Sequence, residues 1–217
     1  MVTATDIKAL RERTGAGMLD CKKALNENDG NLENAIDWLR QKGISKAAKK
    51  SGRAASEGLV EAYIHGGGKI GVLLEINCET DFVALTDNFQ GLARDISMHI
   101  AATAPEYVSK EDVPADAIER ERKVQLARVM EEGKPEHIAE KIVEGRMGKF
   151  YEEICLLEQP YIKEDGKTVG QVLTDAVATI GENIRVRRFS RFVMGEGLEK
   201  KSEDFADEVA AITGMDN

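Results

Sequence analysis

The triple glycine at Gly66–Gly68 separates two apolar runs, residues 59–64 and residues 70–78. Glycine tolerates the backbone angles of a tight turn, and two strand-like runs joined by such a turn are typical of a β-hairpin. The second run is apolar enough to be a central strand. Residues 184–193 alternate as a further strand, whereas most of the remaining chain has helical spacing. The sequence therefore predicts an α+β fold in which helices pack on a small antiparallel sheet.

The first 43 residues predict a module of three short helices. Thr5 is a suitable N-cap for the first helix, and glycines at residues 14–17 turn the chain into the second. The third helix has apolar side chains at i, i+3, i+4 and i+7, at Leu32, Ala35, Ile36 and Leu39. We expect Gly43 to end it. Three helices of this length form a compact module that resembles a ubiquitin-associated domain.

A helical hairpin is predicted around Gly133-Lys134-Pro135, where a helix stop precedes a residue favoured in a first helical turn. The second of these helices carries only a narrow apolar stripe amid dense charge, at Ile138, Ile142, Phe150 and Ile154. A narrow stripe suits an antiparallel coiled-coil arm that buries one seam and projects from the body.

These patterns divide the chain into six parts. We expect the three-helix module at 1–43, a basic and partly helical linker at 44–57, the first part of the core at 58–113, the arm at 114–157, the second part of the core at 158–198 and a C-terminal helix at 199–217.

The charge of the chain bounds its partners. It has 39 acidic and 30 basic side chains, a net charge of −9, and few aromatic residues. An acidic protein repels the phosphate backbone, so we expect no direct binding of nucleic acid. No apolar run approaches the length of a membrane span, and we expect a cytoplasmic protein without a secretory signal. Three widely spaced cysteines fit reduced, buried thiols better than disulfides.

Catalytic motifs are missing from the sequence. The three histidines lie far apart, and neither glycine cluster has the spacing of a nucleotide-binding loop. In the first cluster Asp20 stands where a third glycine would be needed, and the second cluster is flanked by strands rather than by a helix. We therefore expect no enzyme activity, no metal and no cofactor.

The segment Thr80-Asp81-Phe82-Val83 stands out because an aromatic residue follows the polar end of a strand. In one interpretation Thr80 or Asp81 caps a helix and Phe82 folds into the core. In the other, Phe82 is exposed and acts as a wedge against a partner. The pattern alone does not choose between them.

Longer segments resemble a known family. Leu10–Met18 with Asp20–Leu25, and then Glu75–Ala84, are similar to the two signature sequences of the elongation factor Ts family. Residues 133–147 resemble its coiled-coil arm, and residues 167–171 and 193–197 resemble its C-terminal part. The resemblance spans nearly the whole chain.

The resemblance implies a non-enzymatic exchange factor. Such a protein binds elongation factor Tu carrying GDP, disturbs the Mg²⁺ site of that GTPase and speeds GDP release, so that GTP can load. It implies that Thr80, Asp81, Phe82 and Val83 dislocate the partner's Mg²⁺. It further implies partner contacts at Arg11, Met18, Leu19, Lys22, Ile180, Gly181 and Asn183.

Two points stay open at this stage. The chain supplies strands for about one of the two related core subdomains found in longer family members, so it resembles a condensed form. A single half-core would expose part of its sheet. A homodimer or a two-plus-two complex with the partner could cover that surface, and the sequence does not choose between them. The alternative function is a ubiquitin-associated-like adaptor or scaffold for another protein.

Overall fold

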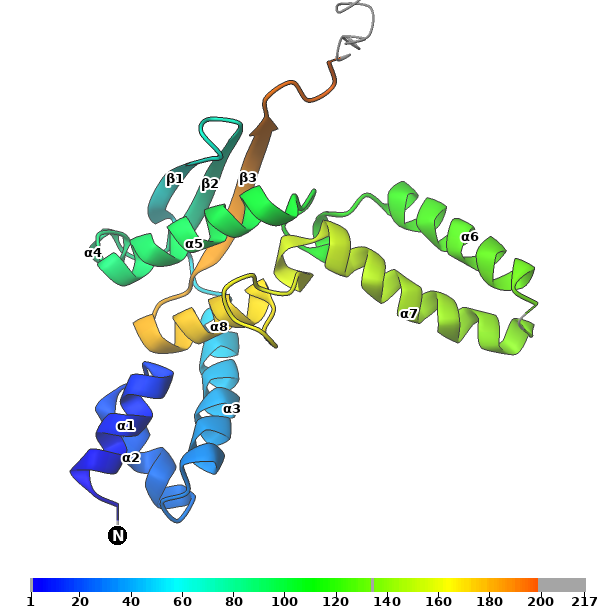
Figure 1. Cartoon of the computed structure of the whole chain (residues 1–217). Coiled ribbons are helices and arrows are strands. Elements are labelled where there is room, and N and C mark those ends of the chain that lie inside the picture. Colours follow the sequence, from blue (N-terminus) through cyan, green and yellow to red (C-terminus); the bar gives the residue numbers. More distant parts are fainter. Residues whose placement is uncertain (1, 134, 199–217) are drawn as a thin grey trace, which may run out of the picture.

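The computed structural model describes residues 2–133 and 135–198. Three helices at the N-terminus stand beside a core of sheet and helices, and a long helical hairpin projects from the core on the other side (Figure 1). This arrangement confirms the predicted α+β fold. The predicted C-terminal helix at 199–217 lies outside the described residues. None of the described helices is both long enough and apolar enough to cross a membrane.

The N-terminal helices are α1 (Ala4–Thr14), α2 (Met18–Glu27) and α3 (Leu32–Lys50). They enclose a small core of their own, made of Leu10, Cys21, Ala24, Leu25 and Ala35. The predicted cap at Thr5 is wrong, because Thr3 is the N-cap of α1. The Thr3 hydroxyl accepts the Asp6 amide, and the Asp6 carboxylate accepts the Thr3 amide in return. This reciprocal capping box satisfies two helix-end donors at once.

Helix α3 does not end at Gly43 as predicted. Gly43 is buried in the helix, and a Cβ atom there would lie 3.2 Å from the Cβ of Ala178 on α8 (Val169–Ile180). The glycine therefore allows two helices to pack closely, and α3 continues to Lys50. Much of the predicted linker is thus helical, and one helix joins the N-terminal module to the core.

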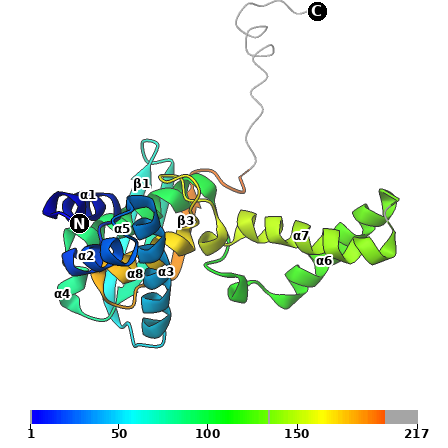
Figure 2. The same cartoon turned by 90° about the horizontal axis from the view of Figure 1, so that it is seen from below.

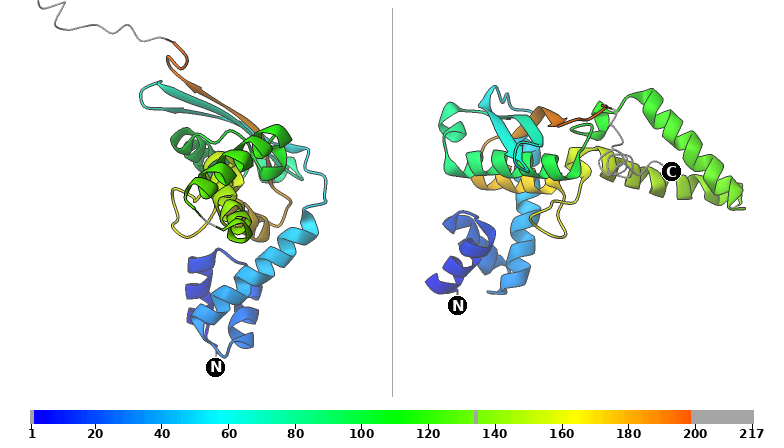
Figure 3. Two further views of the ribbon diagram at one scale, coloured as in Figure 1. Left: turned by 90° about the vertical axis from the view of Figure 1, so that its right-hand side faces the viewer. Right: turned by 45° about the horizontal axis from the view of Figure 1, so that its top comes forward.

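The sheet has three antiparallel strands in the order β1 (Glu57–His65), β2 (Ile70–Cys78) and β3 (Arg185–Val193). The predicted hairpin is confirmed, and its three glycines have positive φ angles of 61°, 66° and 90°. Val72, Leu74 and Ile76 of the central strand are buried in the main core. Helices α5 (Asp87–Thr103) and α8 supply most of the other buried residues of that core from one side of the sheet, as Figure 3 shows.

The opposite face of the sheet is apolar but exposed. Its large side chains come from all three strands, at Val60, Ile64, Leu73 and Phe192. Ile64, Gly71 and Phe192 are paired across the strands in one row, and Ala62, Leu73 and Ser190 in the next. Within the described residues, no element covers this face.

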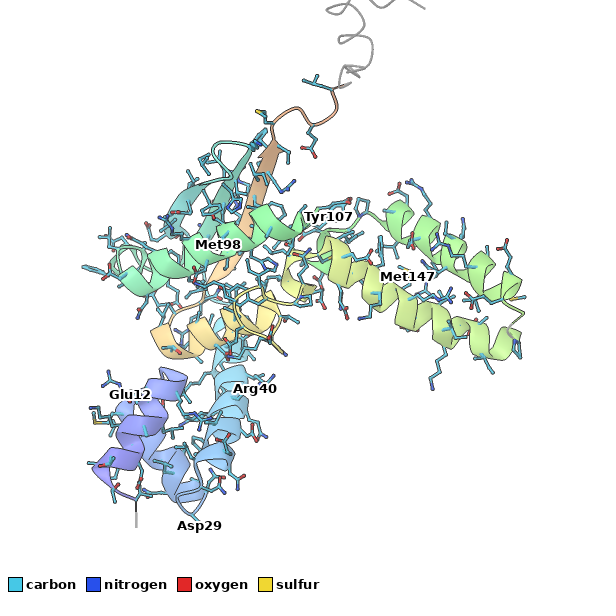
Figure 4. All side chains as sticks on the ribbon, viewed as in Figure 1. Glu12, Asp29, Arg40, Met98, Tyr107 and Met147 are labelled. Carbon is cyan, nitrogen blue, oxygen red and sulfur yellow. The ribbon has the colours of Figure 1, made fainter. Side chains whose placement is uncertain are left out.

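The arm consists of α6 (Ala115–Glu131) and α7 (Glu136–Ile154), which run side by side away from the core (Figure 2). This confirms the predicted helical hairpin. Short 3₁₀ helices, η1 (Lys110–Asp112) and η2 (Leu156–Glu158), flank its root. Tyr107, labelled in Figure 4, lies at the junction of arm and core and pairs with Cys155 in an isolated bridge.

The seam of the arm is rotated by about one residue from the predicted stripe. Val129, Ala139, Val143 and Met147 are buried, whereas Ile138 is 41% exposed. Met147 lies between the two helices in Figure 4. Ile142 and Phe150 flank the seam and are partly buried. The buried row has the i, i+4 spacing of a helix face, but its alanine and methionine gave a weaker hydrophobic signal than the neighbouring isoleucines.

Buried His99 on α5 joins the core to the root of the arm. Its Nδ1 accepts the Ile162 amide at 3.4 Å, which places the proton on Nε2, 3.0 Å from Oε1 of Gln159. Gln159 in turn donates to the carbonyl of Glu153 at the end of α7. Burial lowers the pKa of His99 below its usual 6.5. The folded protein therefore favours the neutral form of this histidine.

We expect His99 to make stability depend on pH. Above pH 6.5 its contribution is constant. Below that value the unfolded chain binds a proton that the folded protein does not yet bind, so the free energy of unfolding falls as the pH drops from 6.5 toward the lowered pKa of the folded state. Urea denaturation at a series of pH values should show this slope in the natural sequence. The control variant His65→Asn should show the same slope, because it replaces an exposed histidine and keeps His99. A slope of the same size in His99→Asn would contradict the assignment.

Candidate functional site

The segment Thr80–Val83 contains the cap and most of a one-turn helix that follows the central strand. Thr80 is the N-cap of α4 (Asp81–Ala84), and its hydroxyl accepts the Val83 amide at 3.4 Å. The Asp81 carboxylate accepts the Phe82 amide at 2.9 Å. The predicted cap is therefore confirmed.

Phe82 does not fold into the core. Its side chain is 79% exposed, and that of Leu85 just beyond the helix is 74% exposed. Ala84 is buried and Val83 packs against the core, so the helix is anchored on one side and displays apolar side chains on the other. Of the two interpretations left open by the sequence, the exposed Phe82 is the one that the structure has. Leu85 is an exposed apolar neighbour that the sequence reasoning did not single out.

Glu182, which the sequence reasoning also missed, holds this turn from the far end of α8. Its Oε2 accepts the amides of Glu79 and Thr80, both at 3.0 Å, and its Oε1 accepts the Thr80 hydroxyl at 2.6 Å. The two segments are more than a hundred residues apart in the chain. The resemblance to the family implied partner contacts at the neighbouring Ile180, Gly181 and Asn183, but it indicated no role for Glu182.

A second layer of contacts surrounds that carboxylate. The Asn183 amide donates to Oε1 of Glu79 at 2.7 Å, and Glu79 also faces Arg53 at 3.5 Å. The Asn183 side chain donates to the carbonyls of Ser51 and Arg53. The end of α3, the end of β2 and the end of α8 therefore meet beneath the exposed turn.

The other predicted binding residues fall into two groups. Arg11, Met18, Leu19 and Lys22 are all exposed on α1 and α2. Helices α1, α2 and α4 all lie at the end of the molecule away from the arm (Figures 1 and 2). In the second group, Ile180 is half-buried, Gly181 is exposed as the left-handed cap of α8, and Asn183 is buried.

The described residues show no constellation for covalent chemistry. None of their His, Cys, Asp and Glu side chains gather in threes where a metal ion could be held. A cavity of about 480 Å³ between the N-terminal helices and α8 contains Asp20, but Lys42 and Lys46 bind that carboxylate at 2.7 and 2.6 Å. All three cysteines are buried, and burial raises the pKa of the Cys155 thiol to about 11. A buried thiol is a poor nucleophile because its thiolate is disfavoured.

Comparison with known proteins gives one consistent result. The family model described as "Elongation factor TS" matches residues 43–196. The elongation factor Ts of Carboxydothermus hydrogenoformans is 63% identical over 211 residues, which cover 97% of each chain. That of Geobacter sulfurreducens is 59% identical over 214 residues, 99% of each chain, and that of Desulforamulus reducens is 62% identical over 210 residues, 97% of each. These matches confirm the resemblance indicated by the signature sequences.

We expect Phe82→Ala to leave the fold intact. The side chain is mostly in water already, so its removal should change the free energy of unfolding by no more than about 0.5 kcal/mol. Phe89→Ala is the matched control, because Phe89 is fully buried seven residues further on and its loss should cost about 3–5 kcal/mol. Urea denaturation measures both. Equal losses of stability in the two variants would mean that Phe82 packs inside the protein in solution.

Proposed function

The chain belongs to the elongation factor Ts family, and from that premise we propose that it is a guanine-nucleotide exchange factor for elongation factor Tu. In this role it binds the GTPase carrying GDP, promotes GDP release and leaves the partner free to load GTP. It acts by binding and catalyses no covalent reaction. Its place of action is the cytoplasm, where translation elongation takes place.

The exposed Phe82 at the tip of a fixed turn is the observation that carries this proposal. A phenylalanine in water gains free energy when a partner buries it, and aromatic anchors dominate the energy of many interfaces. We assign Phe82 as a wedge that enters the partner beside its Mg²⁺ site, with Asp81 next to it. Thr80 and Val83 hold the shape of the turn.

The wedge weakens GDP binding through the metal ion. Mg²⁺ neutralises the charge of the β-phosphate, so displacing the groups that hold Mg²⁺ leaves phosphate charge without compensation. Binding of the exchange factor and binding of GDP therefore oppose each other. The coupling is reciprocal, because the factor by which this protein weakens GDP binding is the factor by which GDP weakens binding of this protein.

The N-terminal module supplies a second contact in this proposal. Met18 and Leu19 are exposed apolar side chains at the start of α2, and Arg11 and Lys22 place positive charge beside them. Apolar anchors with charged neighbours are typical of a protein-binding surface. Gly181 contributes at the rim of the turn together with the half-buried Ile180, whereas buried Asn183 acts by fixing the neighbouring backbone.

Phe82→Ala should slow the stimulated release of GDP. Loss of an aromatic anchor costs about 2 kcal/mol or more, which corresponds to about a thirtyfold lower rate constant per unit concentration. The measurement is release of fluorescent GDP from elongation factor Tu as the concentration of this protein is varied. Met194→Ala is the control, because Met194 is also an exposed large apolar residue and lies at the opposite end of the sheet.

Two outcomes would count against this assignment. Unchanged stimulation by Phe82→Ala would remove Phe82 from the mechanism. A natural-sequence protein that neither binds elongation factor Tu nor speeds GDP release would favour the adaptor alternative instead.

We further propose that the exposed face of the sheet is covered by a second copy of this chain. Apolar residues from all three strands form one surface, and large apolar surfaces of this kind mark interaction sites. At one end of the face Glu75 is bound by Arg187 and Arg188 at 2.7 and 2.6 Å, so its charge is compensated. A face that is apolar in the middle can pair with itself about a twofold axis. A two-plus-two complex with the partner follows from such a dimer.

Phe192→Glu should convert the dimer to a monomer, because it would place a carboxylate without a partner within the paired apolar faces. Sedimentation velocity at several protein concentrations measures this. Ile162→Glu is the control, because Ile162 is exposed but lies outside the sheet. A natural-sequence protein that sediments as a monomer at every concentration would contradict the dimer.

A further inference from the structure

We propose that Glu182 is a positioning residue for nucleotide exchange, because it fixes the orientation of the one-turn helix that carries Asp81 and Phe82. This inference rests on the proposed exchange function. Glu182 itself lies beneath the turn and is partly buried, so its contribution passes through the turn.

The carboxylate suits this position because the turn presents only donors to it. Two consecutive amides, those of Glu79 and Thr80, share Oε2, and the Thr80 hydroxyl donates to Oε1. An ionised carboxylate accepts at both oxygens and donates nothing. The 2.6 Å hydroxyl contact has the short length of a charge-assisted hydrogen bond.

The hydroxyl contact also determines the cap of α4. Because the Thr80 hydroxyl proton points to Glu182, the oxygen lone pairs are left to accept the Val83 amide. Without the carboxylate the hydroxyl can rotate, and the cap loses its preferred orientation. A single helical turn has almost no stability of its own, since fixing its dihedral angles costs more than one hydrogen bond returns. The orientation of Phe82 therefore depends on contacts outside the helix.

Glu182 is itself fixed by the segments on both sides of it. Gly181 before it caps α8 with φ 93°, and the Lys50 amine at the end of α3 donates to the Gly181 carbonyl. Asn183 after it is buried and bonded to the end of α3. The Glu182 carboxylate thus fixes the turn relative to helices α3 and α8.

Glu182→Gln separates this role from the filling of space. Glutamine has nearly the same volume, but one of its two terminal groups is an NH₂ donor. That donor would face either the pair of amides or the hydroxyl, so part of the set of three hydrogen bonds is lost. Asp112→Asn is a matched control, because Asp112 accepts the amide and hydroxyl of Ser109 at 2.9 and 2.8 Å in the same way, near the root of the arm.

The first measurement is hydrogen exchange of the free protein, which does not depend on any partner. Glu182→Gln should raise the exchange rates of the amides at Glu79, Thr80 and Val83 and leave those within the β1–β2 ladder unchanged. Asp112→Asn should leave both sets unchanged. Amides in the turn that exchange as slowly in Glu182→Gln as in the natural sequence would overturn the proposal.

The second measurement is release of fluorescent GDP from elongation factor Tu over a range of concentrations of each variant. A misplaced wedge should lower the maximal stimulated rate by about tenfold or more. The concentration for half-maximal stimulation should change little, because Phe82 and the N-terminal contacts are still present. Loss of global stability alone would move the half-maximal concentration instead, by reducing the amount of folded protein.

Thr80→Val and Thr80→Ser test the same contact from its other side. Valine keeps the shape but removes the hydroxyl, so it should lower the maximal rate as Glu182→Gln does, whereas serine should preserve it. Full activity of both Glu182→Gln and Thr80→Val would overturn the proposal. If the natural sequence itself fails to speed GDP release, the exchange function is what falls, and the hydrogen exchange still decides whether Glu182 fixes the turn.

Discussion

The carboxylate of Glu182 joins the end of β2 to the end of α8, and the exposed turn depends on this junction. The end of a central strand leaves backbone amides that need acceptors when they are partly buried. Here one side chain from a distant segment accepts two of those amides and a capping hydroxyl. The neighbouring Asn183 satisfies two carbonyls after α3 in the same region. Hydrogen bonds therefore join three chain segments at one place, next to the residues that begin α4.

Helix α3 connects this junction to the N-terminal module. Its first half packs in the small N-terminal core, and its second half packs on α8 through the close approach at Gly43. Lys42 and Lys46 of α3 both bind the Asp20 carboxylate, which joins α2 to α3. A single helix shared by two small cores couples them more firmly than a flexible linker would. The two surfaces proposed to contact the partner, at α2 and at α4, are thus carried on one connected support.

Local patterns predicted most of the elements but not the contacts between them. The hairpin at Gly66–Gly68, strand β3 and the arm follow from turn residues and periodicity, which depend on neighbours in the chain. The turn at Thr80 could be placed, yet the exposure of Phe82 could not, because capping and burial are compatible with the same pattern. The prediction that Gly43 ends α3 was wrong, because the sequence does not distinguish a glycine that ends a helix from one that allows a second helix to pack closely. Glu182 was missed because its partners lie about a hundred residues away, beyond the reach of any local pattern.

The exposed Phe82 explains why such a junction is needed. Burying a phenylalanine is worth about 1.5–3 kcal/mol, so an unconstrained chain would turn this side chain toward its own core. Hydrogen bonds to a charged group contribute about 1.5–3 kcal/mol each, and three of them act on the residues just before α4. They favour a conformation of the turn that leaves Phe82 in water. The apolar surface of Phe82 therefore stays available for burial by the proposed partner.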